Sequence, residues 1–401
     1  EALVWLYGTQ RFGIKLGLEN VRRLFGELNL PEQEQRVIHV AGTNGKGSVC
    51  AMIDSILRAR GYRTGLFTSP HLITFRERVQ VNRTMILKSD VADGLTIIHG
   101  LIADWQPHPT FFEITTALAL WHFQRTDCEI VVLETGMGGR LDATNATQPI
   151  VSVITPIDYD HESWLGNSLM KIAAEKAGII KANTPVVSAP QWNEAEQVIR
   201  ARAAECAAPL QFVTESCCHP VALVGSHQKQ NAALAIAALR AGKIAIDEDA
   251  ITRGLASVNW PARFQRWDKR TVIDGAHNPA GARALAKTWQ ESFGSERATV
   301  ILGVLRDKDV VGICRALEPI TRRVLLPQIR SERALPPHEL EKIINTSCSA
   351  IAPEVFPSFR EALNGAQKNS APILITGSLH FAGEALATLQ GVPTAYEECA
   401  Q

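Results

Sequence analysis

The sequence has no surplus of charge of either sign, since its 401 residues carry 41 lysines and arginines against 41 aspartates and glutamates. Proteins that bind nucleic acid need positive charge concentrated on one face, and no basic stripe is present. Long apolar runs are also missing: the most apolar stretches, such as residues 114–123, are about ten residues long, whereas a helix needs about 20 to cross a bilayer. We therefore expect neither a nucleic-acid partner nor a membrane span.

A pattern of paired cysteines is absent as well. No two cysteines form a C-x-x-C pair, and scattered cysteines in a chain of this length are typical of free thiols rather than of a disulfide framework. Adjacent thiols such as Cys217 and Cys218 can oxidise, which stays an alternative. The sequence does not open on a basic and apolar leader, so we expect a cytoplasmic protein. The cysteines are Cys50, Cys128, Cys206, Cys217, Cys218, Cys314, Cys348 and Cys399.

Short apolar runs alternate with helical patterns from residue 36 onward, which is typical of β–α–β units and predicts a mostly parallel sheet. We expect strands over residues 36–41, 62–67, 129–134 and 150–155, and helices over 48–60 and 114–123. The first helix should bury one face, made of Val49, Met52, Ile53, Ile56 and Leu57, and end at Gly61. Because the carboxyl ends of parallel strands line one crevice, the loops after residues 41, 134 and 155 should share a site.

The pattern breaks near Pro261, and a new strand begins at Thr271, which predicts a domain boundary. Further strands at residues 298–303, 323–326 and 372–377 predict a second doubly wound sheet. We expect domains at residues 1–258 and 265–401, joined by a linker at residues 259–264.

A glycine-rich segment, Val40-Ala-Gly-Thr-Asn-Gly-Lys-Gly-Ser48, stands between an expected strand and helix. There its backbone N–H groups form a nest for phosphate, and Lys46 reaches the terminal phosphates. It departs from the standard phosphate-loop pattern, because Val40 replaces the first glycine and Gly47 separates Lys46 from Ser48. A glycine-rich turn with a solvated lysine is the alternative. The predicted nucleotide-binding residues here are Thr43, Asn44, Gly45, Lys46, Gly47 and Ser48.

Four motifs together resemble the folylpolyglutamate synthase/dihydrofolate synthase family, a branch of the Mur ligase superfamily, over about residues 17–380. They are residues 42–48, 68–72, 134–145 and 274–279, in that order. The resemblance implies the Mur ligase architecture. This is an α/β fold with an N-terminal ATPase domain built on a P-loop-type, mostly parallel sheet and a smaller Rossmann-like C-terminal domain.

By resemblance, Ser69, Glu134 and His161 hold two Mg²⁺ ions that bridge the ATP phosphates and the acceptor carboxylate. Ser69 and Glu134 supply the hard oxygen ligands that Mg²⁺ prefers. An imidazole is an unusual ligand for Mg²⁺, so His161 alone would read as a structural histidine. Lys176 resembles the lysine that is carbamylated in this superfamily. Taken alone, it would read as a surface lysine in a salt bridge.

The resemblance also assigns the remaining ligands. Asn231, Arg263 and Asp274 contact the nucleotide, and His277 lies near the acyl phosphate and the incoming glutamate. Ser378 and His380 are weaker candidates for the amino-acid site. Glu113 on its own would be a carboxylate at a helix N-terminus. The residues that contact the pterin-bearing substrate are Thr110, Phe111, Phe112, Glu113, Leu141, Asp142 and Ala143. Arg306 and Phe381 stand where relatives vary, which leaves the amino-acid specificity open.

The implied activity is ATP-dependent ligation through an acyl phosphate. L-Glutamate is joined to the carboxylate of dihydropteroate, to the γ-carboxylate of a (tetrahydro)folate, or to both. We favour the bifunctional form, because residues 110–113 suit a dihydropteroate pocket, and expect a monomer that uses ATP and Mg²⁺. The alternatives are a folylpolyglutamate synthase only, or a P-loop NTPase switch without ligation. A sister Mur ligase that acts on a UDP-linked substrate would need a uridine-binding domain before Val37, where about 35 residues are too few.

Overall fold

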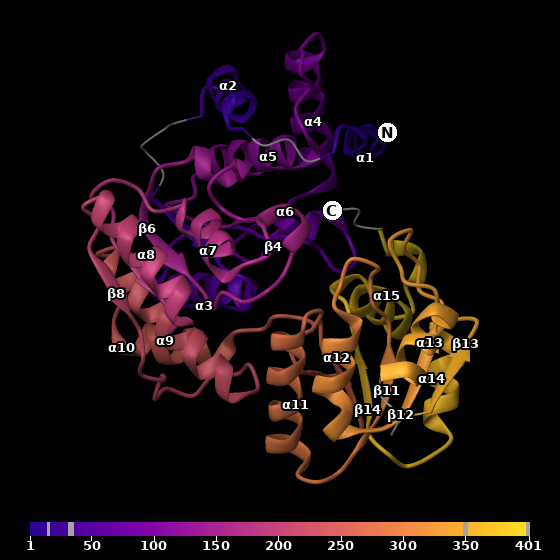
Figure 1. Ribbon diagram of the computed structural model, residues 1–401. Helices are drawn as coiled ribbons and strands as arrows, with labels where there is room; N and C mark the ends of the chain where they lie inside the picture. Colours follow the sequence, from indigo (N-terminus) through magenta and orange to yellow (C-terminus); the bar gives the residue numbers. More distant parts are fainter. Residues whose placement is uncertain (14–16, 31–35, 348–351, 398–401) are drawn as a thin grey trace.

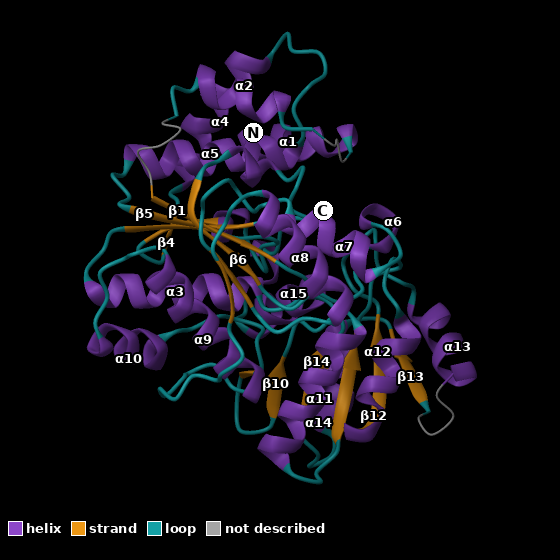
Figure 2. Cartoon of the chain, turned by 60° about the vertical axis from the view of Figure 1, so that its left-hand side comes forward, coloured by secondary structure: helices purple, strands orange, loops and turns teal. Residues whose placement is uncertain are grey.

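Two mostly parallel sheets, each with helices on both faces, make up the computed structural model (Figures 1 and 2). It describes residues 1–13, 17–30, 36–347 and 352–397. Cys348 and Cys399, expected as free thiols, lie outside these residues. Each helix in the described ranges is too short or too polar to cross a membrane.

The first sheet is built from the N-terminal part of the chain. Its strands are β1 (Arg36–Ala41), β2 (Thr64–Phe67), β3 (Val79–Val81), β4 (Thr84–Met85), β5 (Ile130–Glu134), β6 (Pro149–Ile154), β7 (Val186–Ser188) and β8 (Leu210–Phe212). Their order is β4-β3-β2-β5-β1-β6-β7-β8, and only β3 and β4 run antiparallel to their neighbours. The central strand β1 pairs with both β5 and β6. The three strand ends predicted to share a site are therefore adjacent.

Helices α1 (Ala2–Gly8), α2 (Glu19–Glu27), α3 (Lys46–Arg60), α4 (Lys88–Ile102), α5 (Phe111–Arg125), α6 (Glu162–Leu165), α7 (Leu169–Ala177), α8 (Asn193–Glu205), α9 (Ser226–Ala241) and α10 (Glu248–Ser257) belong to this part. Helix α3 begins two residues earlier than expected and ends, as predicted, at Gly61, whose φ is +100°. The five residues expected on its buried face are all fully buried, but the burial is not confined to that face, since residues 47–57 are buried all round. Helix α10 packs on it so closely that a Cβ on Gly254 would lie 2.6 Å from the Ile56 Cα.

The second sheet follows, with strands β9 (Gln265–Arg266), β10 (Thr271–Ile273), β11 (Ala298–Leu302), β12 (Thr321–Pro327), β13 (Pro353–Phe356) and β14 (Ile373–Thr376). Its helices are α11 (Pro279–Phe293), α12 (Val310–Leu317), α13 (Pro337–Ser347), α14 (Phe359–Gln367) and α15 (Leu379–Leu389). The strand order is β13-β12-β11-β14-β10-β9, parallel except at β9. The predicted fold class is confirmed. The domain limits at residues 258 and 265 stay a prediction, although they fall between α10 and β9.

His39 on β1 ties this strand to the loop after β5. Its side chain is fully buried, and its Nε2 lies 2.7 Å from the Thr144 Oγ1. Thr144 in turn donates hydrogen bonds to Asp142 from both its N–H and its hydroxyl. Burial, reinforced by the charge of Lys181, lowers the pKa of His39 to about 3. The imidazole is therefore neutral in the folded protein at neutral and mildly acidic pH.

We expect the free energy of unfolding of the His39→Gln variant to depend less on pH in the acidic range than that of the parent protein. Between the ordinary pKa of 6.5 and the folded value of about 3, the unfolded chain binds a proton at His39 that the folded chain does not. The free energy of unfolding therefore falls as the pH falls, by up to about 1.4 kcal/mol per pH unit. Urea unfolding from pH 6.5 to 4 should show a slope nearly one proton smaller in the variant. An unchanged slope would contradict a neutral His39.

Candidate active site

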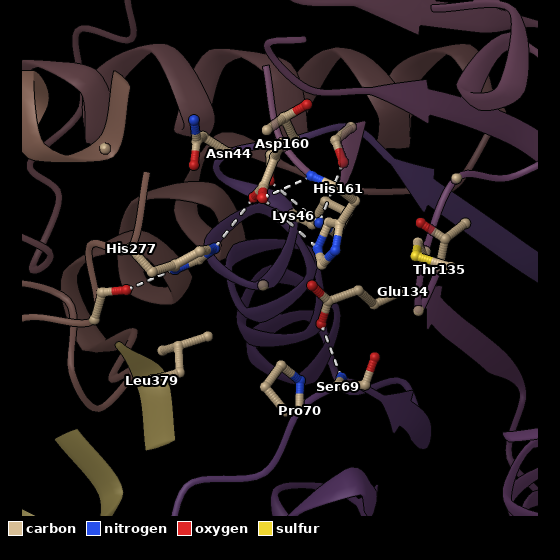
Figure 3. A pocket seen from close by; sticks show the side chains of 18 of the residues that line it. Asn44, Lys46, Ser69, Pro70, Glu134, Thr135, Asp160, His161, His277 and Leu379 are labelled. Carbon is tan, nitrogen blue, oxygen red and sulfur yellow. Dashed lines mark hydrogen bonds and ion pairs between the residues drawn. The ribbon is translucent and has the colours of Figure 1, made fainter. Parts of the chain in front are cut away.

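One large cavity, of about 740 Å³, opens between the two sheets. It is lined by the loops after β1, β2, β5 and β6 on one side and by the loops after β10, β11 and β14 on the other. All the residues predicted above for nucleotide, metal, catalysis and acceptor line this cavity. Figure 3 shows part of it, with Lys46, Glu134 and His161 from the first sheet and His277 from the second.

The glycine-rich loop turns tightly between β1 and α3. The N–H groups of Thr43 and Asn44 donate to the Pro156 carbonyl, at 3.0 and 3.2 Å. A Cβ on Gly42, whose φ is +146°, would lie 1.9 Å from the Thr155 Oγ1, and one on Gly45 would lie 2.8 Å from the Asn231 Oδ1. The loop is thus packed between the end of β6 and α9. The loop and the N-terminus of α3 line the cavity, and N–H groups at such a helix start suit an anion such as phosphate, so we call this segment the nest.

Two lysines converge on this loop. The Lys46 Nζ donates to the carbonyls of Gly42 and Thr43, at 3.1 and 3.2 Å. Lys176 on α7 donates from its Nζ to the same Gly42 carbonyl, at 2.9 Å. Burial, followed by the nearby charge of Lys46, lowers the pKa of Lys176 to about 7. Lys176 is only 4% exposed, so the alternative of a surface lysine is wrong, and its amine is largely neutral above pH 7.

Ser69, Glu134 and His161 face the same part of the cavity (Figure 3). The Ser69 N–H donates to the Glu134 Oε2 at 3.1 Å, while the buried Ser69 Oγ has no hydrogen-bond partner among the described residues. Burial raises the pKa of Glu134, although Lys46 opposes this. Burial lowers the pKa of His161 to about 4 despite the neighbouring Asp160. The unpartnered hydroxyl and the carboxylate are oxygen ligands that suit a hard divalent cation, and the neutral imidazole adds a nitrogen lone pair, which is a less usual ligand for Mg²⁺.

In the part of the chain that the structure describes, no three His, Cys, Asp or Glu side chains form a metal-holding group. A cation held by Ser69, Glu134 and His161 would therefore complete its shell with phosphate and water oxygens, as Mg²⁺ commonly does.

The residues predicted to contact the acceptor substrate near α5 either cap this helix or form the cavity wall. Glu113 accepts hydrogen bonds from the N–H and the hydroxyl of Thr110, at 2.7 and 2.8 Å, and so caps α5. The Phe111 ring stacks on Tyr7 with 5.8 Å between ring centroids. The Phe112 ring covers Gly136 so closely that a Cβ there would lie 2.6 Å away. Phe112 therefore packs directly on the backbone after β5 at the cavity wall.

Asp142 organises the loop after β5. Its Oδ2 accepts from the N–H groups of Gly136 and Met137, at 2.9 and 3.0 Å, and its Oδ1 accepts from Thr144. Burial raises the pKa of Asp142. Both oxygens are engaged by the protein itself, so Asp142 shapes the wall on which Leu141 and Ala143 lie.

The remaining predicted nucleotide residues come from the start of the second part, with Arg263 and Asp274, and from α9 of the first, with Asn231. Asp274 accepts from the N–H groups of Phe264 and Ala276, at 2.7 and 2.9 Å, which fixes the segment that carries Arg263. Burial raises the pKa of Asp274. On α9, Asn231 donates to Gln228, and Gln228 donates to the Ser48 Oγ at 3.4 Å.

Ser378 accepts a hydrogen bond from the Phe381 N–H and caps α15. The neighbouring His380 lines the cavity with a pKa lowered to about 4 by burial and by nearby arginines. The two variable positions do not line the cavity: Arg306 faces Glu339 at the surface, and Phe381 packs on Phe359.

Several cavity residues were not predicted as site residues. Asp160 and Lys308 form an ion pair at 2.7 Å, although their side chains are only 7% and 6% exposed. Asn278 lies beside them and donates to Asp160 at 3.1 Å. Lys308 follows β11 in a charged run, Arg306-Asp-Lys-Asp309. Charged residues directly after a buried strand are a sequence signal by which Lys308 could have been found. His227, Gln228 and Arg333 also line the cavity, but no sequence pattern marked them as site residues.

Comparison with known proteins shows to which family this fold belongs. Residues 40–205 match the Mur ligase middle domain, and residues 262–379 match the Mur ligase glutamate ligase domain. The chain is 37% identical to the dihydrofolate synthase/folylpolyglutamate synthase of Bacillus subtilis, over 95% of this chain and 96% of that protein. The chain belongs to this family of Mur ligases. It is therefore an ATP-dependent ligase.

Solved structures of the same family have the same fold. FolC of Escherichia coli in complex with DHPP and ADP superimposes with a TM-score of 0.88 at 31% identity, over 97% of this chain and 98% of that one. The bifunctional folylpolyglutamate synthase/dihydrofolate synthase of Yersinia pestis, complexed with AMPPNP and Mn ion, gives a TM-score of 0.88 at 28% identity, with the same coverage.

We expect Lys46→Ala to lower ligation at least about 100-fold, because the ammonium group that faces the nest neutralises phosphoryl charge. Far-ultraviolet circular dichroism and urea unfolding should stay near those of the parent protein. Cys50→Ala is the matched control, since Cys50 is fully buried on the same helix and no protein nucleophile is needed. Ligation that survives in Lys46→Ala would contradict the phosphate-binding role.

Proposed function

We propose that this ligase is bifunctional and joins L-glutamate both to the carboxylate of dihydropteroate and to the γ-carboxylate of a tetrahydrofolate. The observation that carries the proposal is the single cavity in which a phosphate nest and an aromatic wall meet. The structure of the relative from Escherichia coli contains DHPP and ADP, which supports a nucleotide and a pterin-bearing acceptor here.

Amide formation from a carboxylate is uphill in water, so the acid must first gain a leaving group. The acceptor carboxylate attacks the γ-phosphorus of ATP in line, which gives an acyl phosphate and ADP. The glutamate amine then attacks the acyl carbon, and the tetrahedral intermediate collapses with loss of phosphate. Lys46 and the N–H groups of the nest stabilise the negative charge that develops in both steps.

Two sets of lining residues suit the two flat ring systems. Phe112 on α5, Leu141 after β5 and Trp164 on α6 offer apolar and aromatic surface for the acceptor ring. On the α9 and α11 side, Asn231, Leu285 and Thr288 are left for the nucleoside. The acceptor carboxylate and the γ-phosphate of ATP would then meet near Glu134 and Lys46.

A divalent cation, when bound, neutralises phosphate oxygens and orients the phosphoryl group. Ser69, Glu134 and His161 would hold it, with two ions as the expected number. The Mn ion in the relative from Yersinia pestis supports a divalent cation. Lys176, in the form of a carbamate, would place an anionic group near the same cation. Its lowered pKa supplies the neutral amine that adds CO₂, and the reaction releases one proton.

Two alternatives remain for experiment. A folylpolyglutamate synthase alone would use tetrahydrofolate but not dihydropteroate. A switch that only hydrolyses nucleotide would not need His277, Ser378 and His380 of the second sheet to line the phosphate cavity. The cytoplasmic location and the monomeric state stay predictions.

The activity is tested by phosphate release from ATP and Mg²⁺ with L-glutamate. We expect rapid release with dihydropteroate and with tetrahydrofolate, little release without an acceptor, and products one glutamate heavier by mass spectrometry. Release with tetrahydrofolate alone would favour the monofunctional alternative. Acceptor-independent hydrolysis without a heavier product would contradict ligation.

The carbamate is tested with ¹³C-labelled bicarbonate. We expect a carbamate carbonyl resonance in the parent protein that is missing in Lys176→Ala. At the same concentration of dissolved ¹³CO₂, its build-up should be faster at pH 8 than at pH 6, because the pKa of about 7 leaves more neutral amine at the higher pH. Added acetate should restore part of the activity of Lys176→Ala but not of Lys46→Ala. Full activity of Lys176→Ala without acetate would contradict the role.

A further inference from the structure

Asp160, in the loop between β6 and α6, is contacted by three side chains from the part of the chain that forms the second sheet. Its Oδ1 accepts from the Lys308 Nζ at 2.7 Å, and its Oδ2 accepts from the Asn278 Nδ2 at 3.1 Å. The His277 Nε2 lies 3.5 Å from the same Oδ2. His277 and Asn278 follow β10, and Lys308 follows β11. The carboxylate of Asp160, in the first part of the molecule, thus binds side chains from two loops of the second part.

The same cluster reaches the phosphate nest. The side-chain amides of Asn278 and Asn44 exchange two hydrogen bonds, at 3.1 and 3.2 Å. The Asn278 Oδ1 also accepts from the Gly281 N–H at 2.8 Å and so caps α11. A continuous chain of polar contacts therefore runs from the nest through Asn278 and Asp160 to Lys308.

The ion pair between Asp160 and Lys308 is buried, so the loss of either partner should be costly. The side chains of Lys308 and Asp160 are 6% and 7% exposed, and removal of one member would leave the other charge poorly solvated. A second ion pair between the same two parts of the molecule offers a comparison. Arg283 on α11 lies 3.5 Å from Asp158, but the arginine side chain is 59% exposed. Water screens that pair, so it should contribute little.

We propose that Asp160 is a positioning residue that clamps the second domain onto the phosphate nest and places Lys308 and His277 over it. Both of its oxygens are engaged by these partners, so it acts through them. The proposal needs the proposed function only in that ligation uses groups from both domains. Loss of the clamp should impair the step that uses the second domain and leave nucleotide binding at the nest largely intact.

The test is a double-mutant cycle with Asp160→Asn and Lys308→Met. Each single variant should lower kcat/KM for L-glutamate by about tenfold or more, and the double variant should be no worse than the worse single one, because the two residues act as a unit. The Kd for ADP, measured by calorimetry, should change by a smaller factor than kcat/KM, since Lys46 and the backbone N–H groups of the nest are not altered. The control cycle with Asp158→Asn and Arg283→Ala should show little change and additive effects.

A structural readout separates the clamp from the chemistry. With ADP bound, small-angle X-ray scattering should give a larger radius of gyration for Asp160→Asn than for the parent protein, and the parent value for Arg283→Ala. Lys308→Arg keeps the charge and should retain most of the activity, even if Asp160→Asn does not fold.

Additive losses, an equal loss of ADP affinity, unchanged scattering in Asp160→Asn, or a Lys308→Arg variant as poor as Lys308→Met would overturn the proposal. If the parent protein shows no glutamate-dependent turnover, the proposed function fails, and scattering still tests the clamp.

Discussion

The packing of the glycine-rich loop between β6 and α9 is the constraint on which the rest of the site depends. A side chain at Gly42 or Gly45 would collide with Thr155 or Asn231, so only glycine lets the backbone close there. The tight turn points the N-terminus of α3 into the cavity and gives the Gly42 carbonyl to both Lys46 and Lys176. Phosphate binding and the placement of two cations thus follow from one backbone path.

Burial of charged groups around this loop gives the site its chemical character. Burial raises the pKa values of Glu134 and Asp274 and lowers those of Lys176 and His161. Each of these shifts favours the neutral form of its group. Asp142 and Glu113, by contrast, use their oxygens to hold the walls of the cavity.

The sequence predicted four of the eight strands of the first sheet, β1, β2, β5 and β6, because buried parallel strands are apolar runs and the loop after β1 needs glycine. It missed β3, β4, β7 and β8, which are only two or three residues long and too short to carry a pattern. Local motifs located Lys46, Glu134 and His277. The Asp160–Lys308 pair joins positions 148 residues apart, and only domain packing brings them together. The neighbours of α3 were likewise invisible, so its burial all round was not predicted.

The central claim is that the acceptor carboxylate meets the γ-phosphoryl group in this cavity. Its most direct test is ligation with an acceptor whose carboxylate carries oxygen-18, followed by mass spectrometry of the phosphate released. An acyl phosphate intermediate predicts transfer of one labelled oxygen from the carboxylate to phosphate. Phosphate without the label, formed together with the amide product, would contradict the account.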